Sequence, residues 1–296
     1  MSHIRNLFHR PFGHHPPPAS AVAAAASTVA MAEELFPSAV IKSGTAAGGS
    51  SATIATLPDF PVEEAKLYPV SRLVFHGDPL SSGADRFRFL RTRLRERGAT
   101  GKLKTLLITS PLAHDGKSTI VMNLATALLE RGKRSVLVIE ADLHHASVAE
   151  RLQLHSWPGL TECLQDRSIS PLSQIRRVEP LGWHLLPAGE PGRNPTELVQ
   201  SRAFGAIIQE LSSYFDWVLF DSPPAIPLTD AIVIQQHADA SLLVVRAGQT
   251  PRAAVEQAVT LLGKNKIVGI VLNGVERRNQ PSYHQGYYRG ARLHED

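Results

Sequence analysis

Short runs of apolar residues alternate with longer segments in which apolar residues recur every three or four positions, from about residue 80 to residue 272. A short continuous apolar run is typical of a strand buried on both faces of a parallel sheet, and the longer spacing is typical of an amphipathic helix. The runs predict strands at 104–109, 135–139, 217–220, 241–245 and 267–272. The periodic segments predict helices at 85–97, 118–131, 195–213 and 251–262. This alternation predicts an α/β fold with a mostly parallel sheet and helices on both of its faces.

The first 72 residues do not show this alternation, and we expect them to form a flexible, low-complexity tail ahead of a domain at 73–275. Residues 14–18 contain consecutive prolines, and 44–56 is a Gly/Ala/Ser/Thr run without an apolar face. The alanine-rich stretch at 21–31 resembles the core and cleavage site of a secretory signal peptide. Because alanine is only weakly apolar and the prolines precede it, we favour a loosely ordered tail. No run approaches the ~18 apolar residues that a membrane-spanning helix needs.

The composition excludes several classes of protein. Of the 296 residues, 43% are hydrophobic, which is enough for a packed core. The single cysteine, Cys163, excludes a disulfide framework and fits a reducing cytosol. Neither Cys163 nor the histidines have the spacing of metal ligands, so no zinc site is predicted. The formal net charge of +4 is mild, and we predict no nucleic-acid partner.

The segment Asp115-Gly116-Lys117-Ser118-Thr119 lies between a predicted strand and a predicted helix. A strand, a tight loop with Gly-Lys-Ser/Thr and a helix together form the context of a phosphate-binding loop. Backbone N–H groups at the helix N-terminus attract phosphate oxygens. Lys117 adds a positive charge at the β- and γ-phosphates, and the Ser118 hydroxyl is a ligand for Mg²⁺. We therefore predict that residues 115–119 bind a nucleotide.

Carboxylates follow two of the predicted strands at the points where the strands end. Glu140 and Asp142 follow one strand, and Asp221 follows the next. In a parallel sheet these ends lie at the same edge as the phosphate-binding loop. Phosphoryl transfer needs hard oxygen ligands for Mg²⁺ and a base that positions the attacking hydroxyl. Acids often follow strands merely because loops are polar, but three acids beside this loop favour a magnesium site.

Together these motifs resemble the bacterial tyrosine kinases of capsule and exopolysaccharide biosynthesis, the CpsD/CapB family. That family has a P-loop, a second motif of three apolar residues followed by Asp-x-Asp, and a Walker B strand that ends in Asp. The corresponding segments here are 108–119, 138–142 and 218–224. Further matches lie at 194–198, 228–231, 244–248 and 272–273. The resemblance covers about residues 73–275 and implies a P-loop NTPase-like fold.

The resemblance also implies ATP and Mg²⁺ as cofactors and a role for each site residue. Lys117, Glu140 and Asp142 would be catalytic, with Glu140 as the base toward the tyrosine hydroxyl. Ser118, Asp142 and Asp221 would hold the metal. Asp115, Gly116, Lys117, Ser118 and Thr119 would bind the phosphates, and Asn273, which closes the last strand, would reach the base of the nucleotide.

The chain departs from the family pattern at several positions. His114 stands where the family loop usually has glycine, so either its backbone has a positive φ or its side chain contacts the phosphates. Glu140 replaces Asp and is one methylene longer, which changes the geometry of the candidate base. His144 and His145 replace the basic residue that usually follows the second acid.

The predicted helix at 85–97 carries six arginines. Asp85, Arg88 and Arg91 have the spacing of the Glu-x-x-Arg-x-x-Arg segment with which family members pack against a neighbouring subunit in a ring. We therefore expect a homo-oligomer interface at these residues. The alternatives are a solvated helix face, or a surface that binds nucleic acid or an anionic membrane.

A polar segment follows the last predicted strand, and a stretch of six residues within it contains three of the five tyrosines. We predict that 276–296 is a flexible tail whose tyrosines, Tyr283, Tyr287 and Tyr288, accept phosphate from a neighbouring subunit, as the resemblance implies. The alternative is a tail without function.

The sequence thus predicts a cytoplasmic, ATP-dependent protein-tyrosine kinase that acts on itself and on polysaccharide-assembly proteins. Because no membrane span is predicted, we expect a separate membrane-anchored chain-length or activator protein to bring it to the inner face of the cell membrane. One alternative is an ATPase switch of the MinD/ParA type, although such proteins carry an extra lysine near the start of the loop, where this chain has residues 110–112. The other alternative is a degenerate nucleotide-binding scaffold that regulates polysaccharide assembly.

Overall fold

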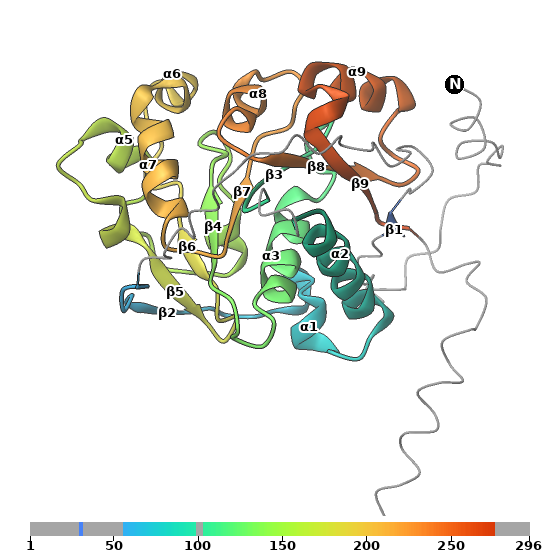
Figure 1. The fold of residues 1–296 in the computed structure, drawn as a ribbon, viewed down its shortest axis with the longest axis horizontal. Coiled ribbons are helices and arrows are strands. Elements are labelled where there is room, and N and C mark those ends of the chain that lie inside the picture. The colour runs from blue at the N-terminus through green and yellow to red at the C-terminus, as the bar shows by residue number, and fades with distance from the viewer. Residues whose placement is uncertain (1–29, 32–55, 99–102, 276–296) are drawn as a thin grey trace, which may run out of the picture.

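The computed structural model describes residues 30–31, 56–98 and 103–275 (Figure 1). The predicted acceptors Tyr283, Tyr287 and Tyr288 lie outside the described residues, as does most of the predicted N-terminal tail. None of the helices in the described ranges is long and apolar enough to cross a membrane.

The described strands form one sheet in the order β1-β9-β8-β3-β7-β4-β6-β5-β2. The neighbouring pairs from β9 to β6 are all parallel, whereas β1 is antiparallel to β9, and β5 is antiparallel to β6 and parallel to β2. The predicted mostly parallel sheet is therefore confirmed. The strands are β1 Ala30–Met31, β2 Val62–Glu64, β3 Thr105–Thr109, β4 Val136–Glu140, β5 Arg176–Glu179, β6 His184–Leu186, β7 Trp217–Asp221, β8 Ala240–Arg246 and β9 Ile267–Asn273.

Helices cover both faces of this sheet (Figure 1). The α-helices are α1 Val74–Gly77, α2 Ser82–Gly98, α3 Lys117–Leu128, α4 Val148–Arg151, α5 Leu160–Gln165, α6 Pro195–Gln200, α7 Arg202–Ser212, α8 Asp230–Gln235 and α9 Arg252–Leu262. Short 3-10 helices occur at η3 Pro69–Ser71, η4 Pro171–Gln174 and η5 Lys264–Lys266.

Alternate strand residues supply two separate cores. In β3, Leu106 and Ile108 pack with α2 and α3, whereas Leu107 packs with α5 and α7 on the other face. Because every residue of β3 is buried, the strand is a continuous apolar run without polar alternation. A smaller apolar cluster joins α9 to β8 and β9.

The predicted helix at 195–213 is two helices. The helix α6 ends at Gln200, and Ser201 is extended, with φ −70° and ψ 152°. The Ser201 hydroxyl accepts a hydrogen bond from the Phe204 N–H and so begins α7. An apolar pattern that continues across both helices hides this break. At the start of α6, Asn194 lies at the predicted cap position, but its side chain donates to Glu197 and does not cap the helix backbone.

Residues 56–72, which we expected in the tail, instead lie in the folded part of the chain. The strand β2 adds to the edge of the sheet beside β5, and η3 leads into α1. Phe60 is buried, with its ring 5.1 Å from that of His184 and 5.9 Å from that of Phe215. The expected tail boundary at residue 72 is therefore too late, because this short segment is held by long-range contacts that leave no periodic pattern.

Candidate functional site

The loop between β3 and α3 ends in a left-handed glycine. Gly116 has φ +102° and is the residue before the first turn of α3, which begins at Lys117 without a side-chain cap. A Cβ at Gly116 would lie 2.1 Å from the Asn273 Nδ2 atom, so both the backbone conformation and the neighbouring side chain require glycine. No side chain caps the first N–H groups of α3, which is the arrangement that anion binding at a helix start requires.

Side chains from β9 and from the segment before α9 hydrogen-bond to Asp115 and hold this loop in place. The Asn273 amide donates to the Asp115 carbonyl oxygen at 2.8 Å. The Thr250 hydroxyl donates to Asp115 Oδ1 at 2.7 Å, and the Leu112 N–H donates to Oδ2 at 3.3 Å. Burial raises the pKa of Asp115, and the Thr250 hydrogen bond opposes that rise. The Asp115 and Asn273 side chains, which we expected at the nucleotide, therefore make their contacts with the protein and shape the loop.

His114 adopts the left-handed conformation that its position suggested. Its φ is +66°, its side chain is exposed, and its carbonyl oxygen accepts a hydrogen bond from Arg246 at 3.3 Å. A non-glycine residue in this region carries some strain, which the surrounding contacts must hold. The first of the two interpretations of His114 is therefore confirmed, and the glycine of the family pattern has a structural reason.

The acids that follow β4 and β7 come together beside the loop. Glu140 and Asp221 are direct partners in the pairing of β4 with β7. Asp221 is buried, and its Oδ1 atom has no hydrogen-bond partner among the described residues. Burial raises the pKa of Asp221 to about 7, although its hydrogen bond with Ser118 and the charge of Lys117 oppose that rise. The Ser118 hydroxyl also accepts a hydrogen bond from Ser147 at 2.8 Å.

Glu140 is held by backbone amides. Its Oε1 atom accepts hydrogen bonds from the N–H groups of Val148 at 2.6 Å and Ala149 at 3.3 Å, and its Oε2 atom accepts one from Ala188 at 3.4 Å. Burial raises its pKa, and these amides oppose the rise. The extra methylene that distinguishes Glu from the Asp of the family pattern thus carries the carboxylate to the start of α4. Glu140 anchors two segments in addition to its expected role as a base.

Asp142 and His144 organise the segment that follows β4. Asp142 Oδ1 accepts a hydrogen bond from the His145 N–H at 3.0 Å. His144 Nε2 lies 2.9 Å from Asp230 Oδ2 at the start of α8, and the Asp230 side chain is only 2% exposed. His144, which replaces the basic residue of the family pattern, therefore has Asp230 as its partner in this chain. Sequence reasoning gave Asp230, Ser147 and Thr250 no role in the site, because each acts there through a contact distant in sequence.

The arrangement fits a magnesium ion only together with a phosphate. Among the described residues, no three His, Cys, Asp or Glu side chains are grouped so that they could hold a metal by themselves. Mg²⁺ is usually bound by one or two carboxylates together with substrate phosphates and water. The Ser118 hydroxyl and the unpartnered oxygen of Asp221 are suitable protein ligands for such an ion.

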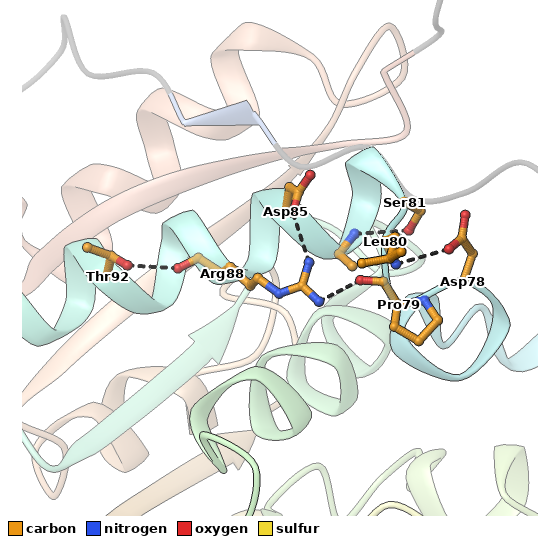
Figure 2. Close-up of polar contacts among 8 residues, drawn as sticks. Asp78, Pro79, Leu80, Ser81, Asp85, Arg88 and Thr92 are labelled. Atoms are coloured by element: carbon orange, nitrogen blue, oxygen red, sulfur yellow. Dashed lines mark hydrogen bonds and ion pairs between the residues drawn. The ribbon is translucent and has the colours of Figure 1, made fainter. Parts of the chain in front are cut away.

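The side chains predicted at an oligomer interface are already engaged within the chain. Arg88 donates to Asp85 at 2.8 Å and to the Pro79 carbonyl oxygen (Figure 2). Its guanidinium lies 5.4 Å from the centre of the Phe75 ring. Arg91 donates to the Ala127 carbonyl oxygen of α3 at 3.1 Å. Each of the three residues remains partly exposed. They make contacts within the chain around α2, and an interface there would have to use the remaining donors of the arginines and the remaining acceptor positions of Asp85.

No protein-family model matches the chain, but several curated proteins are similar to it. It is 31% identical over 213 residues to the tyrosine-protein kinase YwqD of Bacillus subtilis, covering 71% of this chain and 88% of YwqD. It is 31% identical over 224 residues to the putative tyrosine-protein kinase CapB of Staphylococcus aureus, covering 75% and 96%. It is 30% identical over 232 residues to the tyrosine-protein kinase ptk of Acinetobacter johnsonii, but spans only 31% of that protein's length.

Two solved structures are also similar to this chain. The chimerical protein CapA2B2 superposes with a TM-score of 0.65 and 25% identity, covering 74% of this chain and 96% of that one. The kinase domain of the Escherichia coli tyrosine kinase ETK superposes with a TM-score of 0.66 and 26% identity, covering 71% and 83%.

Proposed function

The chain belongs to the family of bacterial tyrosine kinases that includes YwqD and CapB, and from this premise we propose that it transfers the γ-phosphate of ATP to tyrosine side chains. The observation that carries the proposal is the meeting of three elements at one sheet edge: the Gly116 turn, the Ser118 hydroxyl and the buried, half-partnered Asp221. We take 73–275, together with the packed segment 56–72, as the kinase domain.

Each site residue has a defined task in this proposal. The start of α3 and Lys117 bind the phosphates, and the turn at Gly116 aims the N–H groups of residues 117–119 at them. Ser118, Asp142 and Asp221 hold Mg²⁺, which supplies charge stabilisation to the transferring phosphoryl group. Glu140 accepts the proton of the tyrosine hydroxyl. Asp115, Thr250 and Asn273 act from behind the loop by keeping its shape.

The proposed acceptors are Tyr283, Tyr287 and Tyr288 of a second copy of the chain, and polysaccharide-assembly proteins. A homo-oligomer that uses the exposed parts of Asp85, Arg88 and Arg91 would bring such a tail to a neighbouring site. A membrane-anchored activator protein would place the kinase at the inner face of the cell membrane. The similarity to the chimerical protein CapA2B2 and to the much longer ptk supports a role in such an assembly.

The test is phosphotyrosine mapping by mass spectrometry after incubation of the full chain with labelled ATP, Mg²⁺ and a cytoplasmic peptide of the candidate activator. We expect label on the C-terminal tyrosines that disappears in Lys117→Met. The matched control is Lys133→Met, which changes an exposed lysine outside the loop and should keep the label. Phosphate release without tyrosine label would instead indicate a MinD/ParA-type switch. Nucleotide binding with neither product would indicate a degenerate scaffold.

A further inference from the structure

A cavity of about 200 Å³ lies between the segment after β4 and the segment after β6. Its walls include Glu140, Ala146, Ala149, Trp157, Pro187 and Ala188. A cavity of roughly 150 Å³ is sufficient to bind benzene, so this one has room for a single six-membered aromatic ring but not for a folded peptide. Most of the lining is apolar, and its polar members are Glu140, Glu150, His155 and Ser156.

The aromatic wall of the cavity is fixed in place. The Trp157 indole N–H donates to the Gln174 carbonyl oxygen at 2.9 Å, and the Arg176 guanidinium lies 5.7 Å from the centre of its ring. These contacts hold an otherwise half-exposed indole in one orientation. An aromatic ligand would therefore meet a wall that loses little further freedom on binding.

The opposite wall is equally constrained. The Leu160 and Thr161 N–H groups donate to the carbonyl oxygens of Pro187 and Ala188 at 2.8 and 2.9 Å. A Cβ at Gly189 would lie 2.0 Å from the Glu162 carboxylate, so the segment packs there without space for a side chain. Both walls are thus preformed, as is usual for a small-molecule or side-chain site.

The cavity adjoins the phosphate-binding loop. Ala146 and Ala149, which line it, flank Ser147, and the Ser147 hydroxyl donates to Ser118 at 2.8 Å. Glu140 lines the cavity and is the strand partner of Asp221. A ring seated here would place its substituent beside the carboxylate that we propose as the base.

We propose that this cavity binds the phenol ring of the acceptor tyrosine and that Trp157 and Ala146 determine the preference for tyrosine over serine and threonine. The inference rests on the proposed kinase function and names the part of the site that receives the substrate. An aromatic side chain buries about 150–250 Å² when it enters such a site, and serine has no comparable surface to bury. The residue class is therefore selected by the shape and apolar walls of the cavity before any chemistry occurs.

The test measures peptide binding and phosphorylation separately. The protein is the full chain with alanine at positions 283, 287 and 288, so that its own tail does not compete. The probe is a fluorescent peptide of residues 279–292 in which only Tyr287 is retained, and binding is followed by anisotropy. Parallel titrations use a fluorescent ADP analogue.

We expect Ala146→Leu, which adds bulk at a residue that lines the cavity, to weaken peptide binding by about tenfold or more, equivalent to ~1.4 kcal/mol. The matched control is Ala253→Leu, the same change at an exposed alanine of α9, which should bind the peptide as the parent does. Trp157→Leu should also weaken binding, and Trp157→Phe should restore most of it. The affinity for the ADP analogue should change less than about twofold in all of these variants. A peptide with Phe at 287 should bind within a few-fold of the tyrosine peptide, and one with Ser should not bind.

Three results would overturn the inference. The first is the absence of measurable peptide binding by the parent protein. The second is unchanged peptide affinity in both Ala146→Leu and Trp157→Leu. The third is loss of affinity for the ADP analogue with unchanged peptide affinity, which would assign the cavity to the nucleotide base. Peptide binding that follows the expected pattern in a protein that never forms phosphotyrosine would support the cavity while refuting the proposed kinase function.

Discussion

Replacement of Gly116 by alanine should destabilise the phosphate-binding loop in two separable ways. Alanine in a left-handed conformation costs about 1–2 kcal/mol. In addition, the new Cβ would lie 2.1 Å from Asn273 Nδ2 and would displace that amide from its 2.8 Å hydrogen bond with the Asp115 carbonyl oxygen. Loss of a buried hydrogen bond that leaves an acceptor unpaired costs about 1–3 kcal/mol. We therefore expect Gly116→Ala to lower the free energy of unfolding by ~2–5 kcal/mol.

The two contributions can be separated with a second glycine. Gly132 has φ +82° and nothing within 4 Å of the position of an added Cβ, so Gly132→Ala reports the backbone cost alone. Asn273→Ala should cost ~1–3 kcal/mol by itself. In Gly116→Ala the hydrogen bond of Asn273 is already lost. The double variant Gly116→Ala/Asn273→Ala should therefore be less destabilised than the sum of the two single variants, by about 1–3 kcal/mol. Gly132→Ala and Asn273→Ala should be additive.

The assay is urea unfolding of each single and double variant, together with titration of a fluorescent ADP analogue. A domain of this size shifts its Tm by about 2–4 °C per kcal/mol, so thermal unfolding gives a second measurement. Additivity of Gly116→Ala with Asn273→Ala to within ~0.5 kcal/mol would refute the coupling. Loss of ADP affinity in Asn273→Ala without any loss of stability would instead favour a direct contact of Asn273 with the nucleotide.

Three further predictions concern buried ionisable groups. Glu140→Gln should lower the free energy of unfolding by ~1–3 kcal/mol, because one of the two oxygens that accept backbone N–H groups becomes an NH2 donor, which leaves a buried N–H group without an acceptor. The exposed Glu150→Gln is the control, and equal stability of the two variants in urea would contradict the anchoring role. Asp221→Asn should stabilise the Mg²⁺-free protein at pH 8 but not at pH 4. Burial raises the pKa of Asp221 in the folded state to about 7, so the wild-type free energy of unfolding falls, by up to ~4 kcal/mol, as the pH rises from about 4 to 7. A stabilisation that is equal at both pH values would exclude this cause. His184→Phe should reduce the loss of stability between pH 6.5 and 4. Burial lowers the pKa of His184 to about 4, so folding favours the neutral ring, and this contribution is present above pH 6.5 and lost on acidification. An unchanged dependence of the free energy of unfolding on pH, measured in urea, would argue against this cause.

Much of the central architecture could be read from local patterns. Five of the six strands in the parallel part of the sheet are nearly continuous apolar runs, and their burial explains why no regular polar alternation interrupts them. The strands β5 and β6 were not predicted, because they are short and lie in a segment without periodicity. The break at Ser201 was missed for the opposite reason, since the apolar spacing runs on through it.

Some features of the candidate site could likewise be predicted from the sequence, and others could not. The identities of Lys117, Ser118, Glu140, Asp142 and Asp221 and their position at one edge of the sheet follow from the order of strands and helices, because parallel strands present their carboxyl ends together. Gly116 and His114 are recognisable as positions of unusual backbone conformation from the motif alone. What those acids do is less local. The direction of the Glu140 carboxylate depends on amides eight and 48 residues away.

The sequence by itself thus determined the fold class, the phosphate-binding loop and the set of acids beside it, because each follows from local patterns and from the order of strands and helices along the chain. Only the tertiary structure decided that Asn273 and Thr250 hydrogen-bond to Asp115 and hold the loop, and that Trp157 and Ala146 line a cavity beside Glu140. It also decided that one oxygen of Asp221 has no partner among the residues the structure describes. Hydrogen-bond partners, burial and empty space depend on which distant segments pack together, and no local pattern encodes that choice.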